Sequence, residues 1–201
     1  MRKLIVIEFM TLDGVVQAPS YPDEDTEGGF SHGGWNTPFL DDISMKWAMG
    51  NVTSAGSFLF GRRTYETFAA HWPDASDEEQ VLAEPFNTRQ KYVASTTLTE
   101  PLEWQNSTLL QGETVASVAA LKQSGGDSLH VYGSTQLVHA LLASNLVDEL
   151  RLMIDPILLG RGKRIFHDES ALTSLRLIDS QPATTGAILT TYRTGNGAPL
   201  A

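Results

Sequence analysis

Two short segments carry residues suited to holding an anion, and each has the order strand, glycine, helix. Residues 61–64 (GRRT) follow the apolar run 57–60, and residues 133–136 (GSTQ) follow the apolar run 129–132. A helix that starts directly after a parallel strand directs free backbone N–H groups and the positive end of its dipole toward the carboxyl edge of the sheet. Two such helix starts converging on one diphosphate would suit a dinucleotide.

The two turns differ in the side chains that they offer. Arg62 and Arg63 add positive charge, and the planar guanidinium group of arginine engages two phosphate oxygens at once. The second turn offers the hydroxyl groups of Ser134 and Thr135 and no charge. A strand–glycine–helix turn also occurs in many α/β proteins for packing reasons alone, so neither turn by itself distinguishes a ligand site from a packing device.

The charge balance of the chain makes the arginine pair informative. With 14 lysines and arginines against 24 aspartates and glutamates, the net charge is −10. This acidity excludes the broad basic surface that nucleic-acid binders use, so DNA and RNA are not expected partners. An anionic ligand needs local positive charge to overcome such a field, and Arg62-Arg63 supply it. Because the sequence has no cysteine, disulfides and thiolate catalysis are excluded, and any redox chemistry must come from a cofactor.

Strands and helices alternate around the two turns. The nearly continuous apolar run of residues 3–10 (KLIVIEFM) predicts a central strand covered on both faces. The Gly-, Pro- and Asp-rich residues 11–38 predict a long loop. Asn36 or Thr37, before Pro38, is the expected N-cap of a helix over residues 39–52. Further strands are predicted at residues 57–60, 91–95, 107–110 and 129–132, and further helices at residues 62–70, 114–123 and 135–144.

From residue 149 onward the pattern changes to strands alone, at residues 150–154, 175–179 and 188–192. Alternating elements followed by strands predict an α/β fold: a mostly parallel central sheet with helices on both faces and a C-terminal antiparallel β hairpin. The length of 201 residues suits one domain. We expect this domain to span residues 1–194, followed by a flexible tail over residues 195–201.

The apolar stretches are too short for a membrane span. None approaches the roughly 20 residues that are needed to cross a bilayer. Arg2-Lys3 precede an apolar run of only a few residues, which does not fit a signal peptide. The sequence therefore predicts no membrane partner and a cytoplasmic location.

Four motifs, in order along the chain, resemble those of one superfamily. Residues 60–68 (FGRRTYETF) and 131–142 (VYGSTQLVHALL) resemble the two glycine turns of dihydrofolate reductases. Residues 11–14 (TLDG) and 156–162 (PILLGRG) are similar to segments of the reductase domain of riboflavin biosynthesis proteins, the RibD C-terminal domain. The resemblance spans residues 3–193 and implies a dihydrofolate reductase-like fold and an NADPH-dependent reductase.

The resemblance also implies roles for particular residues. The GRRT turn would hold the phosphates of the cofactor, residues 95–96 would border the adenine ribose and its 2′-phosphate, and the second turn would hold the diphosphate. Phe9, Val15 and Val16 would line the nicotinamide. NADPH is then preferred to NADH. The expected cofactor-binding residues are Phe9, Val16, Gly61, Arg62, Arg63, Thr64, Ser95, Thr96, Gly133, Ser134, Thr135 and Gln136.

No catalytic acid or base stands out, and the candidates have structural alternatives. Dihydrofolate reductases carry a carboxylate early in their first helix, where Asp41 and Asp42 lie here. Adjacent acids in a first helical turn more often complement the helix dipole in solvent. Asp13, after the first strand, is the other candidate, and it equally fits a turn with Gly14. We take Asp13 and Asp42 as the expected catalytic residues.

Other constellations give weaker signals. Residues 23–28 imitate half of a calcium loop but lack its final glutamate, and the histidines show no metal spacing, so we expect no metal site. The basic residues 160–164 fit either a contact to a substrate phosphate or a solvated turn. Aromatic residues in the 11–38 loop fit either a substrate lid or an ordinary surface loop.

Two functions remain open at this point. The first is an NADPH-dependent reductase that acts on a small heterocycle, either pterin- or dihydrofolate-like or resembling 5-amino-6-(5-phosphoribosylamino)uracil. The sequence departs from the riboflavin branch after Thr64, where residues 65–68 (YETF) replace an Asp-Asn-Pro stretch, and this departure weakens the pyrimidine alternative. The second function is an NADPH-binding homodimeric protein without turnover. A homodimer is compatible with both.

Overall fold

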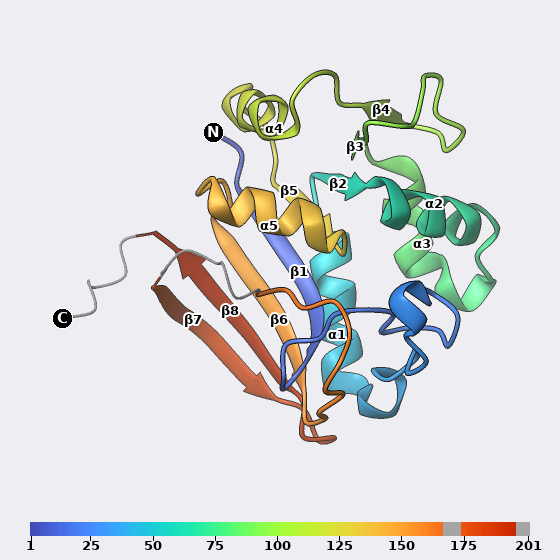
Figure 1. Ribbon diagram of the computed structural model, residues 1–201, viewed down its shortest axis with the longest axis vertical. Coiled ribbons are helices and arrows are strands. Elements are labelled where there is room, and N and C mark those ends of the chain that lie inside the picture. The colour runs from blue at the N-terminus through green and yellow to red at the C-terminus, as the bar shows by residue number, and fades with distance from the viewer. Residues whose placement is uncertain (167–173, 196–201) are drawn as a thin grey trace.

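The strands of the chain form one sheet, in the order β4-β3-β2-β5-β1-β6-β8-β7 (Figure 1). A computed structural model describes residues 1–166 and 174–195. The strands are β1 (Leu4–Thr11), β2 (Ser57–Gly61), β3 (Lys91–Ala94), β4 (Ser107–Leu109), β5 (Leu129–Tyr132), β6 (Glu149–Asp155), β7 (Leu175–Pro182) and β8 (Ile188–Thr194). The α-helices are α1 (Asp42–Thr53), α2 (Arg62–His71), α3 (Gln80–Thr88), α4 (Thr114–Gln123) and α5 (Thr135–Ala143). Among the described residues, no helix has the length and apolar character of a membrane span.

The strand directions confirm the predicted α/β fold. Strands β1 to β6 pair in parallel, with β1 in the middle between β5 and β6. Strand β8 is antiparallel to both β6 and β7 and so forms the predicted C-terminal hairpin with β7. Residues 196–201, most of the expected tail, lie outside the described residues.

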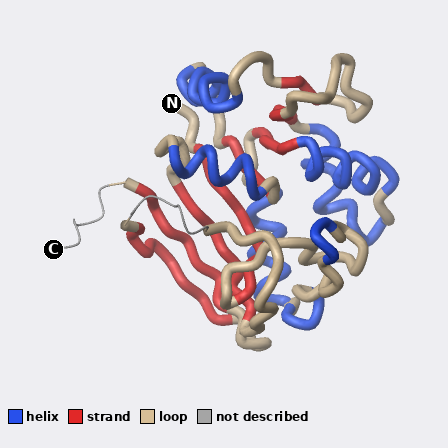
Figure 2. Tube along the Cα trace, in the orientation of Figure 1, coloured by secondary structure: helices blue, strands red, loops and turns tan. Residues whose placement is uncertain are grey.

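Helices cover both faces of the sheet, which explains the continuous apolar run of β1 (Figure 2). Leu4 and Val6 point to the face where α4 and α5 bury residues such as Val118 and Leu141. On the opposite face, Ile5 and Ile7 of β1 pack in a second cluster with apolar side chains of α1, α2 and α3. Residues 4–7 of β1 therefore meet a packed layer on each face of the sheet, as a central strand requires.

Helix α1 begins later than predicted, and its cap is Asp41, not Asn36 or Thr37. Pro38 lies in a short 3-10 helix, Thr37–Phe39, and Leu40 is extended, so the two turns are not continuous. The Asp41 side chain accepts a hydrogen bond from the Ser44 backbone N–H at 2.8 Å. The Ser44 hydroxyl accepts one from the Asp41 N–H, which completes a capping box.

Helix α3 was not predicted from the sequence. It contains Pro85, which removes a helical hydrogen bond and usually ends a helix. Tertiary packing compensates for this loss, because Ala83, Pro85 and Phe86 are all buried. The Phe86 ring packs at a tilt of 35° against the Phe58 ring, with 4.6 Å between the ring centroids. Burial of one helix face thus outweighs a poor local propensity.

The 11–38 segment is the predicted long loop, and it has a core of its own. Val15, Ala18, Phe30 and Trp35 are buried against one another. The Trp35 indole N–H donates to the Gln17 carbonyl at 2.7 Å. Its regular structure consists of two 3-10 helices, Glu27–Gly29 and Thr37–Phe39, and one bridge from Val15 to Arg164. The loop is therefore a packed part of the domain.

Candidate functional site

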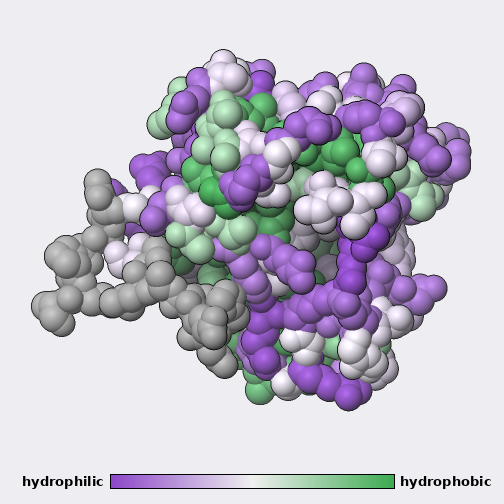
Figure 3. Space-filling view, turned by 45° about the horizontal axis from the view of Figure 1, so that its top comes forward, coloured by the Kyte–Doolittle hydropathy of each residue, from purple (hydrophilic) through white to green (hydrophobic). Residues whose placement is uncertain are grey.

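A large cleft opens at the carboxyl ends of the parallel strands. Its volume is about 1220 Å³, and it is lined by the ends of β1, β2, β3 and β5, the starts of α2 and α5, residues 16–20 and 23–27 of the loop, and residues 162–164. On this side of the molecule, apolar surface lies among surrounding hydrophilic residues (Figure 3). Open α/β sheets bind their ligands at this edge.

The two glycine turns meet in this cleft and are joined by hydrogen bonds. The Gly61 N–H donates to the Ser134 hydroxyl at 2.7 Å, and the Ser134 hydroxyl donates to the Thr64 hydroxyl at 2.8 Å. A Cβ on Gly61 would lie 2.9 Å from the Ser134 hydroxyl oxygen, and a Cβ on Gly133 would lie 2.9 Å from that of Thr64. The glycines therefore allow the turns to touch, so the packing explanation accounts for their presence.

The starts of α2 and α5 leave backbone donors available in the cleft. Neither N-cap, Gly61 nor Ser134, makes a side-chain hydrogen bond to its helix. In contrast, Asp41 caps α1 and Glu113 caps α4 through side-chain acceptors. Free first-turn N–H groups and the helix dipole favour an anion at both uncapped ends. These donors are compatible with a diphosphate.

The two arginines have different surroundings. The Arg62 side chain has no hydrogen bond or ion pair with any described residue, whereas Arg63 binds Glu27 through both terminal nitrogens. Glu27 also pairs with Lys163 at 2.7 Å. The hydrogen bonds from Arg63 and then from Lys163 lower the pKa of Glu27 to about 2. Arg62 is thus open to an anion, while Arg63 must exchange Glu27 for it.

The other predicted cofactor contacts also line the cleft. Ser95 follows β3, and its hydroxyl accepts hydrogen bonds from the backbone of Thr97 and Leu98, which fixes the turn that presents Thr96. Val15 is fully buried in the loop core and does not line the cleft. The predicted cofactor-binding residues that line the cleft are Phe9, Val16, Gly61, Arg62, Arg63, Thr64, Ser95, Thr96, Gly133, Ser134, Thr135 and Gln136.

The two predicted catalytic carboxylates lie outside this lining. Asp42 is exposed in the first turn of α1. Asp13 accepts hydrogen bonds from the Thr11 hydroxyl at 2.6 Å and the Gly160 N–H at 2.8 Å. Burial acts to raise the pKa of Asp13, but these hydrogen bonds outweigh it and lower the pKa. Asp13 therefore joins the loop to residues 159–160, and a catalytic role for it or for Asp42 stays a prediction without geometric support.

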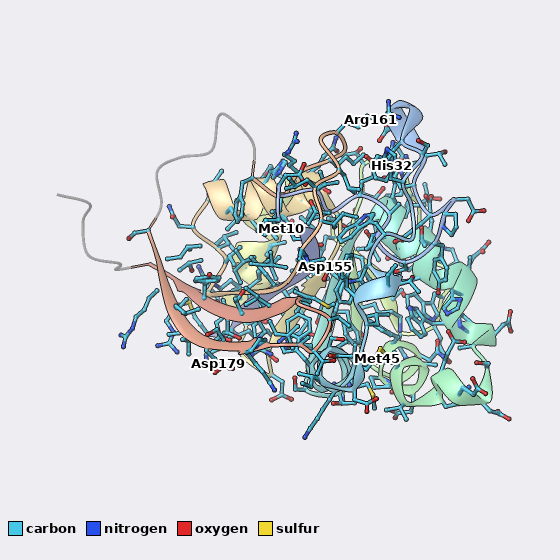
Figure 4. All side chains as sticks on the ribbon, turned by 90° about the horizontal axis from the view of Figure 1, so that it is seen from below. Met10, His32, Met45, Asp155, Arg161 and Asp179 are labelled. Atoms are coloured by element: carbon cyan, nitrogen blue, oxygen red, sulfur yellow. The ribbon has the colours of Figure 1, made fainter. Side chains whose placement is uncertain are left out.

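Two buried carboxyl groups were missed in the sequence. Asp155 is fully buried at the end of β6 and accepts a hydrogen bond from the Asn36 amide at 2.8 Å (Figure 4). Burial raises its pKa to about 7, although the Asn36 bond acts in the opposite direction. Glu8 is buried in β1 and lines the cleft. A single acidic residue inside an apolar strand was the available signal for Glu8.

The basic residues 160–164 fasten the loop to the rest of the domain. Lys163 pairs with Asp25 as well as Glu27, and Arg164 pairs with Asp13 at 3.5 Å. Arg161 donates to the Ser31 hydroxyl at 3.3 Å and lies near His32 of the loop (Figure 4). Two acidic residues of the calcium-like segment, Asp25 and Glu27, are thus bound to cations of the protein. Within residues 1–166 and 174–195, no group of three or more histidine or acidic side chains is placed to hold a metal.

A parallel sheet with helices on both faces, a C-terminal hairpin and this cleft define a protein with a dihydrofolate reductase-like fold. Dihydrofolate reductase from Enterococcus faecalis, solved with NADP(H), superimposes with a TM-score of 0.61 at 12% identity, over 96% of this chain and 97% of that one. A putative riboflavin biosynthesis protein from Shewanella sp. PV-4 gives a TM-score of 0.68 at 20% identity, over 96% and 99% of the two chains.

Sequence comparison identifies the family. The RibD C-terminal domain family matches residues 2–189. The uncharacterized protein YyaP of Bacillus subtilis (strain 168) is 26% identical over 197 residues, which cover 95% of this chain and 94% of YyaP. The chain belongs to the RibD C-terminal domain family.

Proposed function

We propose that the protein is an NADPH-dependent reductase that transfers a hydride to a small heterocycle. The observation that carries the proposal is the meeting of two uncapped helix N-termini beside Arg62 in one cleft. When bound, the nicotinamide supplies the hydride, and the protein orients it and excludes water. Residues 61–64 and 133–136 would hold the phosphates, and the side chains of Arg62 and Arg63 would reach the ribose 2′-phosphate, which Ser95 and Thr96 would border. Phe9 and Val16 would line the nicotinamide.

The proposal is tested by titrating the purified protein with NADPH and, separately, with NADH. Nicotinamide fluorescence and calorimetry measure the binding in each titration. Tight binding of NADPH and weak binding of NADH is the expected result. Oxidation of bound NADPH is then tested with dihydrofolate and with pyrimidine acceptors. The name of the Shewanella neighbour favours a substrate from riboflavin biosynthesis, and the likeness to a dihydrofolate reductase favours a pterin. Failure to bind either cofactor would refute the proposal.

A second candidate is an NADPH-binding protein without turnover. The observation that favours it is the position of Asp13 and Asp42 outside the cleft, which removes the predicted proton donors from the site. The two functions differ in one result. A reductase oxidises bound NADPH when a suitable acceptor is present, whereas a binding protein leaves it reduced.

Replacement of Glu27 should strengthen cofactor binding. Glu27→Gln releases Arg63 and removes a negative charge from the mouth of the cleft. We expect the affinity for NADPH to rise a few-fold at low salt, and the gain to shrink as salt screens the charges. Calorimetric titration at two salt concentrations measures it. Glu78→Gln makes the same change of net charge at an exposed position outside the cleft lining and should leave the affinity unchanged. An unchanged affinity in Glu27→Gln would show that Glu27 does not compete with the cofactor.

We also propose a homodimer that forms through the edge strand β7. Residues 176–182 are exposed along this strand. Leu177 of β7 and Ile188 of the neighbouring strand β8 expose about half of their surface, 51% and 46%. Among the described residues β7 pairs with β8 alone, and an edge strand with exposed apolar side chains favours association with another strand. Sedimentation velocity should give twice the 21.9 kDa mass of the chain for the wild type. The double variant Leu177→Lys, Ile188→Lys should sediment as a monomer, and a monomeric wild type would refute the dimer.

A further inference from the structure

Glu8 is an ionisable residue at the centre of an apolar strand, and it borders the cleft. Only 6% of the surface of Glu8 is exposed, and Glu8 lines the cleft together with Ile7 and Phe9. The register pairs Ile7 with Tyr132 at the end of β5, so Glu8 lies level with the start of the Gly133 turn. Alternation along β1 puts its side chain on the face of Val6 and Met10, which is the face covered by α5. Glu8 is therefore next to the second predicted phosphate turn.

The Glu8 carboxyl group lacks the partners that other buried acids have. Its Oε1 atom is sealed from solvent and has no hydrogen-bond partner among the described residues. Glu149, on the neighbouring strand, receives hydrogen bonds from Lys3 at 2.8 Å and Arg151 at 3.0 Å. An unpaired carboxylate is costly to bury, and such a group normally keeps its proton instead.

The surroundings of Glu8 favour the neutral acid. On β6, the residue in register with it is the apolar Leu152. The charged group that acts on it is Glu24 of the loop, which has the same sign as ionised Glu8. Burial, and next the charge of Glu24, raise the pKa of Glu8 to about 8. At neutral pH the group is therefore mostly a carboxylic acid, which has one hydrogen-bond donor and one acceptor.

We propose that Glu8 recognises an amide group of the bound ligand by donating the O–H of its carboxyl group to the amide oxygen. The buried Oε1 atom leaves the other carboxyl oxygen to face the cleft, and a protonated carboxyl group can donate there to an amide oxygen. The inference rests on the proposed function, which offers two sources of an amide. One is the carboxamide of the nicotinamide, and the other is the ring amide of a pterin or pyrimidine.

Binding measurements on Glu8 variants test the proposal. The probes are NADPH, 2′-phospho-ADP-ribose, which lacks the nicotinamide, and dihydrofolate added to the NADPH complex. Glu8→Gln keeps a donor and an acceptor and should bind all three within a few-fold of the wild type. Glu8→Leu has neither and should weaken binding of the amide-bearing ligand by roughly fivefold, which is the expected loss of one neutral hydrogen bond. If Glu8→Leu binds NADPH more weakly, the carboxamide is the group that Glu8 recognises. If it binds only dihydrofolate more weakly, the ring amide is that group.

The pH dependence separates this role from a purely structural one. Binding of the amide-bearing ligand to the wild type should weaken above about pH 8, as Glu8 ionises, and Glu8→Gln should lack this decrease. Glu24→Gln removes the like charge and should therefore move the midpoint of this pH dependence to lower pH than in the wild type. Equal binding of all probes by wild type and Glu8→Leu, with no pH effect, would overturn the inference and leave the proposed function intact. A wild type that binds neither NADPH nor 2′-phospho-ADP-ribose would overturn both.

Discussion

Arg62→Ala is expected to weaken NADPH binding roughly ten- to a hundredfold and to leave NADH binding nearly unchanged. This range corresponds to the loss of about 1.5–3 kcal/mol for hydrogen bonds to a charged group. Arg62 is exposed and lines the cleft, and its removal breaks no hydrogen bond or ion pair with the described residues. The variant should therefore fold as the wild type does. Calorimetric titration with each cofactor measures the effect.

Arg63→Ala is the informative companion variant. Arg63 must give up Glu27 before it can hold a phosphate, so its loss should cost less NADPH affinity than the loss of Arg62. Both variants should still affect NADPH far more than NADH. Arg176→Ala removes an exposed arginine from β7, away from the cleft lining, and should change neither affinity. Equal losses for NADPH and NADH in Arg62→Ala would contradict the assignment of these arginines to the 2′-phosphate.

The fold was predictable because its local signals agree with its tertiary packing. Residues 114–123 and 129–132 were predicted with the bounds that the structure has, since a glycine pair ends the helix and an apolar run fills the strand. Helix α3 was missed because Pro85 is unfavourable in a helix and only burial of Phe86 and its neighbours compensates for it. Local propensity predicts an element when packing reinforces it and fails when packing opposes it.

The candidate site was predictable only in its backbone outline. Each glycine turn is formed by consecutive residues, so both turns could be located from the sequence. The ion pair of Arg63 with Glu27 joins residues 36 positions apart, and the pair of Asn36 and Asp155 joins residues 119 positions apart. Such contacts depend on how the chain folds back on itself. For this reason the sequence could not show that Arg63 is occupied or that Asp155 is buried.

Asp155→Asn should stabilise the protein at pH 8 and have less effect at pH 5. The pKa of Asp155 is about 7 in the folded state and 3.8 as its ordinary value. Between these values the unfolded chain releases the proton while the folded chain keeps it, so stability falls as pH rises, by about 1.4 kcal/mol per pH unit for this group. Below about pH 4 both states hold the proton, and above about pH 7 both have lost it, so the effect is constant outside this window.

Urea denaturation from pH 4 to pH 9 would measure this change in the free energy of unfolding. Asparagine keeps an acceptor for the Asn36 amide and carries no charge, so the Asp155→Asn variant should lose this part of the pH dependence and gain a few kcal/mol at pH 8 relative to the wild type. Ionisation of Glu8 also makes the free energy of unfolding fall as pH rises, up to about pH 8. This contribution is the same in both proteins, because both keep Glu8. Asp74→Asn, at an exposed position away from β7, is the matched control and should retain the full slope. A slope in Asp155→Asn equal to that of the wild type would show that Asp155 ionises at its ordinary pKa, and hence that water reaches it in the folded protein.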